Sequence, residues 1–300
     1  MLLIYSTYNS PRLQYIADVL LYHLSGIAVS FTTRPDEFIQ HDGPKINYSS
    51  GTLAQDEVKI IPASLLFETG ITAQNTYCKE RGGYKILFPA DNGDLPFDIF
   101  AASFYLLSRY EEYLPHRLDE YGRFAHTEST AYKEGFLQQP LINYWLVDFQ
   151  KLLQSKFTSL VFATKKFQFI PTYDIDIAFS YLHKGIARNS GGLVRSLLKG
   201  ELADMKERIA VLTKKKDDPF DVYEWLYALH LKYNLQPYYF FLVAAKPGNY
   251  DKNVDPQHAE MRELIRYHAV GYNTGIHPSW QSGDDNKLLE DEIQTLEDII

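Results

Sequence analysis

The second half of the chain alternates short apolar stretches with longer amphipathic ones, and this order constrains its fold more than any other feature. Strands are predicted over 167–173, 237–243 and 271–276, and helices over 219–233, 256–269 and 285–300. The stretch from Pro237 to Val243 is almost entirely apolar, which is typical of a parallel strand covered on both faces. The repeated strand–helix order predicts a parallel sheet or barrel with right-handed crossovers.

The first half predicts a separate α/β domain. Ser10 and Pro11 suit a helix start between predicted strands at 2–5 and 27–31, and Gly26 suits the helix end. Further strands are predicted over 45–48, 58–61 and 85–88, and helices over 97–113 and 137–153. We therefore expect an N-terminal α/β domain of unknown role over 1–155 and a second domain over 156–300.

Composition excludes several classes of protein. Of 300 residues, 45% are hydrophobic and the net charge is −8, which argues against nucleic acid as the main partner. The single cysteine, Cys78, cannot form an internal disulfide or a multi-cysteine metal site. The apolar run at Leu2–Ile4 is too short for a signal peptide, and no stretch approaches the ~20 apolar residues of a membrane span. We expect a cytoplasmic protein without stable membrane insertion.

A helical insertion near 184–216 interrupts the first strand-to-helix connection of the second domain. Apolar residues space as one helical stripe over 191–212, and cationic residues make the other side basic: Lys199, Lys206, Arg208 and Lys214 to Lys216. A solvated helix face beside a charged loop is the favoured interpretation. The alternative is a docking patch for an anionic polymer or a membrane surface.

Two carboxylates lie at the end of the first predicted strand of the second domain. Side chains alternate along a strand, so Asp174 and Asp176 point the same way and repel each other. Such a pair needs a cation, a proton or much water. The carboxyl ends of parallel strands are where ligands bind in α/β domains.

His277 follows the end of the third predicted strand, so it can face Asp176 if the two strands are close. A carboxylate and an imidazole around an open position suit Zn²⁺ or a similar divalent ion, and the other carboxylate can take a proton from water. Taken alone, the two aspartates also suit a solvated turn or helix cap, and the histidine also suits a structural hydrogen bond. Together they favour one site.

Thr172-Tyr173-Asp174-Ile175-Asp176 and the later His277 carry a family resemblance. From about residue 168 onward the chain resembles the polysaccharide deacetylases (NodB homology) of carbohydrate esterase family 4, which open with an Asp-x-Asp motif and follow it with a histidine motif. The resemblance implies a distorted (β/α) barrel, Asp174 as catalytic base, and Asp176 and His277 as ligands of a divalent metal, zinc before cobalt or nickel. The first 155 residues resemble an uncharacterised domain that precedes such domains in some bacterial proteins.

The chain departs from this family in two ways. Gln281 stands where the second histidine of the motif is expected, and only three strand–helix units are visible. We therefore expect a partial barrel whose open sheet edge favours self-association. Asp251, Lys252 and Asn253 follow the second strand, and Ser279 follows His277; these four are the candidate substrate-binding residues, although a plain hydrophilic turn explains the loop equally well.

The function expected from these residues is metal-dependent hydrolysis of an acetyl group on an amino sugar or polysaccharide. The competing interpretation is a non-catalytic carbohydrate-binding or assembly protein that keeps the barrel without its chemistry. Gln281 and the missing later strands favour this second interpretation. In both cases the expected partner is a carbohydrate.

Overall fold

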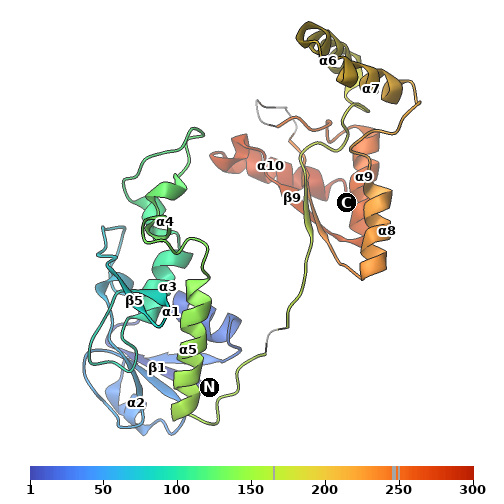
Figure 1. Cartoon of the computed structure of the whole chain (residues 1–300). Helices are drawn as coiled ribbons and strands as arrows, with labels where there is room; N and C mark the ends of the chain where they lie inside the picture. The colour runs from blue at the N-terminus through green and yellow to red at the C-terminus, as the bar shows by residue number, and fades with distance from the viewer. Residues whose placement is uncertain (165, 245–247, 249–250) are drawn as a thin grey trace. The chain divides into compact units, whose positions relative to one another are not determined.

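The structure, a computed structural model, describes residues 1–164, 166–244, 248 and 251–300 of the chain. It divides into two compact units, Met1–Lys165 and Lys166–Ile300 (Figure 1). Both units are mixed α/β structures built on parallel sheets, as the sequence predicted.

A four-stranded parallel sheet forms the centre of the first unit, with the order β2-β1-β3-β4. Its strands are β1 (Leu2–Ser6), β2 (Val29–Thr32), β3 (Lys45–Tyr48) and β4 (Val58–Ile60). An antiparallel hairpin of β5 (Cys78–Arg81) and β6 (Tyr84–Leu87) follows. Strand β5 was not predicted, because its exposed Lys-Glu-Arg segment lacks apolar alternation.

Helices cover both faces of this sheet. They are α1 (Pro11–Ala17), continued by a π-helical turn at Asp18–His23, α2 (Pro35–Gln40), α3 (Ile99–Leu107), α4 (Thr130–Lys133) and α5 (Leu141–Lys156). One core joins Leu2, Ile4 and Ile46 to α1, α3 and α5, while Leu3 and Tyr5 pack with Phe38 of α2 on the opposite face. This alternation is the pattern of a parallel strand buried on two sides.

The helix predicted over 97–113 ends early. Arg109 adopts a left-handed backbone with φ of 51°, which stops α3 at Leu107 and starts a short 3-10 turn at Tyr110–Tyr113. A left-handed conformation is costly for a residue with a Cβ and cannot be read from apolar spacing. The 97–113 prediction is therefore wrong at its C-terminal end.

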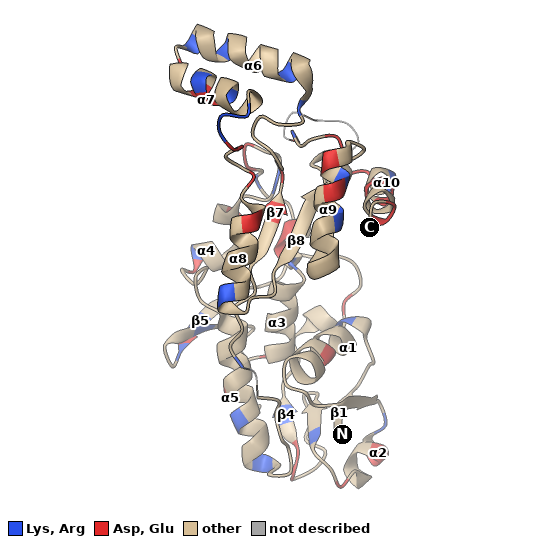
Figure 2. Cartoon of the chain, turned by 90° about the vertical axis from the view of Figure 1, so that its right-hand side faces the viewer, with Lys and Arg blue, Asp and Glu red and all other residues tan. Residues whose placement is uncertain are grey.

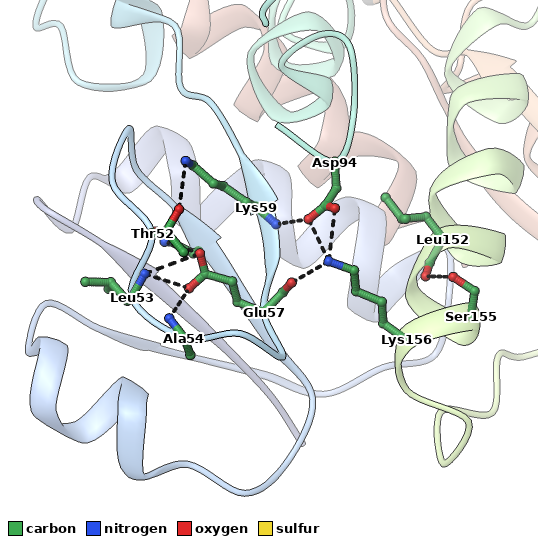
Figure 3. A network of polar contacts seen from close by, with 10 residues as sticks. Thr52, Leu53, Ala54, Glu57, Lys59, Asp94, Leu152, Ser155 and Lys156 are labelled. Atoms are coloured by element: carbon green, nitrogen blue, oxygen red, sulfur yellow. Dashed lines mark hydrogen bonds and ion pairs between the residues drawn. The ribbon is translucent and has the colours of Figure 1, made fainter. Parts of the chain in front are cut away.

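The first unit extends ten residues beyond the boundary expected at 155. Leu160 is buried in its core, and the Ala163 amide donates a hydrogen bond of 2.9 Å to the Ser25 carbonyl. At the end of α5, Lys156 Nζ donates to the Glu57 carbonyl at 2.7 Å and to both carboxylate oxygens of Asp94 (Figure 3). These contacts fasten the last helix and the following segment to the sheet.

The second unit contains a three-stranded parallel sheet with the order β7-β8-β9. Its elements are β7 (Thr172–Ile175), β8 (Tyr238–Leu242), β9 (Asn273–His277), α8 (Tyr223–Tyr233), α9 (Ala259–Gly271) and α10 (Asn286–Glu297). The first strand was predicted too early, over 167–173. Phe167 and Phe169 are exposed instead of paired, so apolar character alone misplaced it.

The helical insertion is a pair of helices, α6 (Gly185–Lys199) and α7 (Leu202–Leu212), where the sequence predicted one stripe over 191–212. Gly200 ends α6 with a left-handed φ of 71°, and α7 turns back to lie beside α6 (Figure 2). Among the described residues, none of the helices has the length and apolar character required to cross a membrane.

Candidate functional site

The two faces of the β7-β8-β9 sheet differ in what covers them. Tyr239 and Phe241 point into a core that also contains buried side chains of α8, α9 and α10. Residues on the other face stay accessible, among them Asp174 and Tyr238. Asp174 is paired with Phe240 on β8, and Phe240 is paired with Gly275 on β9. The accessible face therefore carries Asp174, the predicted catalytic carboxylate.

Asp176 and His277 meet at the carboxyl edge of this sheet. His277 Nε2 lies 3.4 Å from Asp176 Oδ1. Asp176 follows the end of β7, and His277 is the last residue of β9. Strand β8 lies between these two strands, and its residue Leu242 is paired with His277. The two side chains therefore approach each other across the end of β8. Thus the residues that the sequence placed at two strand ends contact each other in the structure.

Asp174 lies one alternation before Asp176 on the exposed side of β7. Residues two apart in a strand are separated by about 7 Å along it, so one bound molecule can contact both carboxylates. Both aspartates are exposed, and water therefore screens their mutual repulsion. The arrangement leaves Asp174 accessible as a proton acceptor.

The geometry of the pair fits two ligands of a divalent metal. Two ligand atoms on a tetrahedral zinc ion are separated by about 3.4 Å, given metal–ligand bonds of about 2.1 Å. The measured separation matches this distance and is longer than a good N–H···O hydrogen bond. However, no group of three or more His, Cys, Asp or Glu residues suitable for a metal occurs in the described part of the chain.

The environment of the other ring nitrogen of His277, Nδ1, affects how well this histidine can hold a metal. His277 Nδ1 is buried and has no hydrogen-bond partner among the described residues. Metal-bound histidines usually donate this second N–H to a carboxylate or carbonyl, which fixes the ring. The pair therefore supplies two ligand atoms without the usual outer support, and we expect weaker binding than in a three-ligand zinc site.

Asn253 holds the carboxyl ends of β7 and β8 together. Its Nδ2 donates to the Ile175 carbonyl at 2.9 Å and to the Leu242 carbonyl at 3.0 Å. Its Oδ1 accepts from the Ala178 and Val254 amides, each at 2.9 Å. Asn253 was predicted to bind substrate; in the structure its amide atoms bond backbone groups on both sides of Asp176, at Ile175 and Ala178, and connect this segment to the end of β8.

The other three predicted substrate-binding residues lie in the surrounding loops. Asp251 is buried and accepts a hydrogen bond of 3.1 Å from the Trp280 amide, which links the loop after β8 to the loop after β9. Ser279 is also buried, and its amide donates to Glu292. Lys252 exposes its side chain, while its carbonyl accepts from Arg188. Of these residues, Lys252 is the most accessible to a bound molecule.

An aromatic surface beside Asp174 was missed by the sequence analysis. The rings of Tyr238 and Phe240 lie nearly parallel, 6.4 Å apart at an angle of 16°. A Cβ on Gly275 would come within 3.0 Å of the Phe240 ring, so the glycine makes room for it. Accessible aromatic rings can pack against the apolar faces of sugar rings. The alternation in Tyr-Tyr-Phe-Phe was the available signal, because every second aromatic residue must face away from the core.

The covered face of the sheet contains two buried histidines that lie outside the candidate site. His230 and His268 are each 1% exposed and pack against Tyr239. Burial lowers the pKa of both imidazoles below its ordinary value. The Tyr173 hydroxyl and His230 Nε2 form a hydrogen bond of 2.9 Å. His230, His268 and their tyrosine neighbours are therefore part of the packing of the core.

A pocket of about 450 Å³ lies in the first unit and contains none of the predicted site residues. Arg109, with its left-handed backbone, lines it together with Glu112, His126 and Asn143, and Tyr105 lies among the apolar residues of its wall. Burial is the main cause that raises the pKa of Tyr105 to about 12. Strained backbone beside a pocket often marks functional residues. No residue pattern around Arg109 predicts this conformation.

Comparisons with known proteins bear on the first unit. A model of a family of unknown function, DUF7033, matches residues 2–158, which is more than half of the chain and covers almost all of the first unit. No curated protein and no solved structure matches the chain significantly.

Proposed function

The chain belongs to DUF7033, a family of unknown function, and we propose that its second unit hydrolyses acetyl groups on an amino sugar or polysaccharide. The observation that carries this proposal is the approach of Asp176 Oδ1 and His277 Nε2 to 3.4 Å at the carboxyl edge of a parallel sheet. Asp174 lies on β7, two residues before Asp176, and is likewise exposed. This combination of residues supports hydrolysis at one small site.

Each residue has a distinct role in this proposal. Asp176 and His277 hold a divalent metal, zinc before cobalt or nickel. When bound, such an ion polarises an acetyl carbonyl and lowers the pKa of water. Asp174 accepts the proton that the attacking water loses, for which an exposed carboxylate near a cation is suited. If the partial barrel that the family resemblance implies is formed, the accessible sheet face would line its interior.

A carbohydrate substrate is supported by the surface next to these residues. Tyr238 and Phe240 place two nearly parallel aromatic rings on the face that carries Asp174. A sugar ring stacked there places its substituents toward the strand ends. The exposed Lys252 lies in the loop after β8, at the same edge of the sheet.

The test compares acetate release from acetylated glucosamine oligomers by the wild type, Asp174→Asn and Asp284→Asn. Asp284 is an exposed aspartate outside the site and serves as the matched control. We expect Asp174→Asn to lower the rate at least about 100-fold while the control variant keeps full activity, because only Asp174 takes the proton. Equal acetate release by wild type and Asp174→Asn, at rates above the uncatalysed reaction, would overturn the assignment of the base.

A second candidate function is carbohydrate binding without chemistry. The observation that favours it is the incomplete ligand set: Gln281 replaces the second histidine, and no third metal-binding residue joins Asp176 and His277 within the described ranges. A binder would hold acetylated and deacetylated oligomers equally without releasing acetate. Calorimetric titration with both forms, followed by acetate measurement, separates the two functions.

A further inference from the structure

The α6–α7 hairpin, residues 184–216, exposes several large apolar side chains and buries two polar residues of α6. On α6, Ile186 is 87% exposed and Leu198 is 82% exposed. On the same helix, Asn189 and Ser196 are buried. A helix of a globular protein normally buries its apolar stripe, so α6 has the reverse orientation.

Spacing shows that the exposed apolar residues form one continuous stripe. Ile186 and Leu197 follow helical spacing together with the half-buried Leu193, and Val194 and Leu198 continue the same side at 57% and 82% exposure. Leu202, Ile209 and Leu212 add exposed apolar surface on α7. This amount of apolar surface on two adjacent helices indicates a binding face rather than scattered surface residues.

Specific contacts fix the hairpin in this orientation. Asn189 Nδ2 donates to the Tyr181 carbonyl at 3.0 Å, and its Oδ1 accepts from Arg208 at 3.2 Å. The Arg208 guanidinium also lies 4.7 Å from the centre of the Tyr181 ring. Gly192 allows this approach, because a Cβ there would lie 2.5 Å from the guanidinium. The inward polar side therefore forms a built interface, which leaves the apolar side facing out.

The charge of the hairpin is opposite to that of the whole chain. Residues 184–216 contain nine Lys and Arg and three Asp and Glu, a net charge of +6, whereas the whole chain carries −8. Figure 2 shows the basic residues distributed over both helices. On α6, Arg195 and Lys199 share the side next to the apolar stripe, whereas Arg188 donates to the carbonyls of Lys252 and Asn253. An apolar stripe flanked by cations is complementary to lipid with anionic headgroups.

From these observations we infer that the outer face of the α6–α7 hairpin docks on the surface of an anionic lipid bilayer. The apolar side chains enter the boundary between headgroups and acyl chains, and the flanking cations contact the headgroup phosphates. The helices lie in the plane of the surface and do not cross it. This inference does not depend on the proposed hydrolase activity.

The test is sedimentation of the full chain with vesicles of phosphatidylcholine, with and without phosphatidylglycerol. One variant carries Ile186→Gln and Leu198→Gln, and a second carries Arg195→Gln and Lys199→Gln. The matched control carries Val161→Gln and Val270→Gln, which are 80% and 91% exposed outside the hairpin. All six side chains are solvent-exposed, and unchanged circular dichroism checks that each variant folds.

We expect binding to the anionic vesicles only. The cation variant should bind about 25-fold more weakly, about fivefold for each charge removed, and the apolar variant at least about tenfold more weakly. The control should bind as the wild type does. Failure of the wild type to bind anionic vesicles, or equal loss in the control variant, would refute the inference.

Two other occupants give distinguishable results. A soluble anionic polymer would bind through the cations alone, so heparin would compete and the apolar variant would bind vesicles as well as the wild type. A second copy of the chain would give a dimer in sedimentation velocity that the apolar variant loses, without vesicle binding. Either result would overturn docking on lipid.

Discussion

Removing the side chain of Asn253 tests whether this residue builds the candidate site. Asn253→Ala deletes four hydrogen bonds of 2.9–3.0 Å, two to the carbonyls of Ile175 and Leu242 and two from the amides of Ala178 and Val254. A hydrogen bond of this kind contributes about 0.5–1.5 kcal/mol, and water can reach part of this half-buried position. We therefore expect the second unit to lose about 3 kcal/mol of unfolding free energy.

Urea unfolding followed by hydrogen exchange measures this loss separately for the two units. With a slope of about 2 kcal/mol per M, the midpoint of the second unit should fall by about 1.5 M, while that of the first unit stays unchanged. Asn273→Ala, an exposed asparagine on β9, is the matched control and should shift the midpoint little. Asn253→Asp should be as destabilising as Asn253→Ala, because a carboxylate oxygen would face two carbonyls. An Asn253→Ala midpoint within error of the wild type would refute the reasoning.

Three further predictions concern pH and packing. Burial raises the pKa of Asp98 to about 6, so the first unit should lose up to about 3 kcal/mol as the pH rises from 4 to 7; a flat urea midpoint over this range would contradict it. The second unit should behave in the opposite way, because burial lowers the pKa values of His230 and His268: it should lose stability as the pH falls below about 6.5, and hydrogen exchange of that unit measures the loss. Gly275→Val should displace the Phe240 ring and weaken oligosaccharide binding in calorimetric titration, at a stability cost of about 1–2 kcal/mol; undiminished binding would separate the aromatic surface from carbohydrate recognition.

The positions of β8 and β9 and the meeting of Asp176 with His277 were predictable, because they follow from periodicity and parallel topology. A continuous apolar run such as Tyr238–Leu242 predicts a buried parallel strand. Parallel strands bring their carboxyl ends to one edge of the sheet, which places Asp176 and His277 close together. Among the residues that the structure describes, no group of three or more metal-binding His, Cys, Asp or Glu side chains is found. The assigned roles in catalysis and metal binding stay predictions.

Features that depend on single backbone conformations or on long-range side-chain bonds were not predictable. Gly200 divides the insertion into two helices, and the left-handed backbone of Arg109 ends α3, yet neither residue disturbs the apolar pattern in a way that fixes the break. Asn253 reaches the end of a strand 78 residues away, which no local signal encodes. The exposure of Ile186 and Leu198 could not be predicted from the sequence either, because apolar residues at helical spacing normally indicate a buried helix face.

Zinc titration of the wild type beside Asp176→Ala and His277→Ala tests the central claim most directly, with bound metal measured by elemental mass spectrometry after dialysis. The 3.4 Å approach of the two side chains predicts one zinc ion per chain in the wild type and its loss in each variant. Asp284→Ala, in an exposed position outside the site, should keep the metal. Equal zinc in all four proteins, or none in the wild type at saturating zinc, would contradict a metal site at Asp176 and His277.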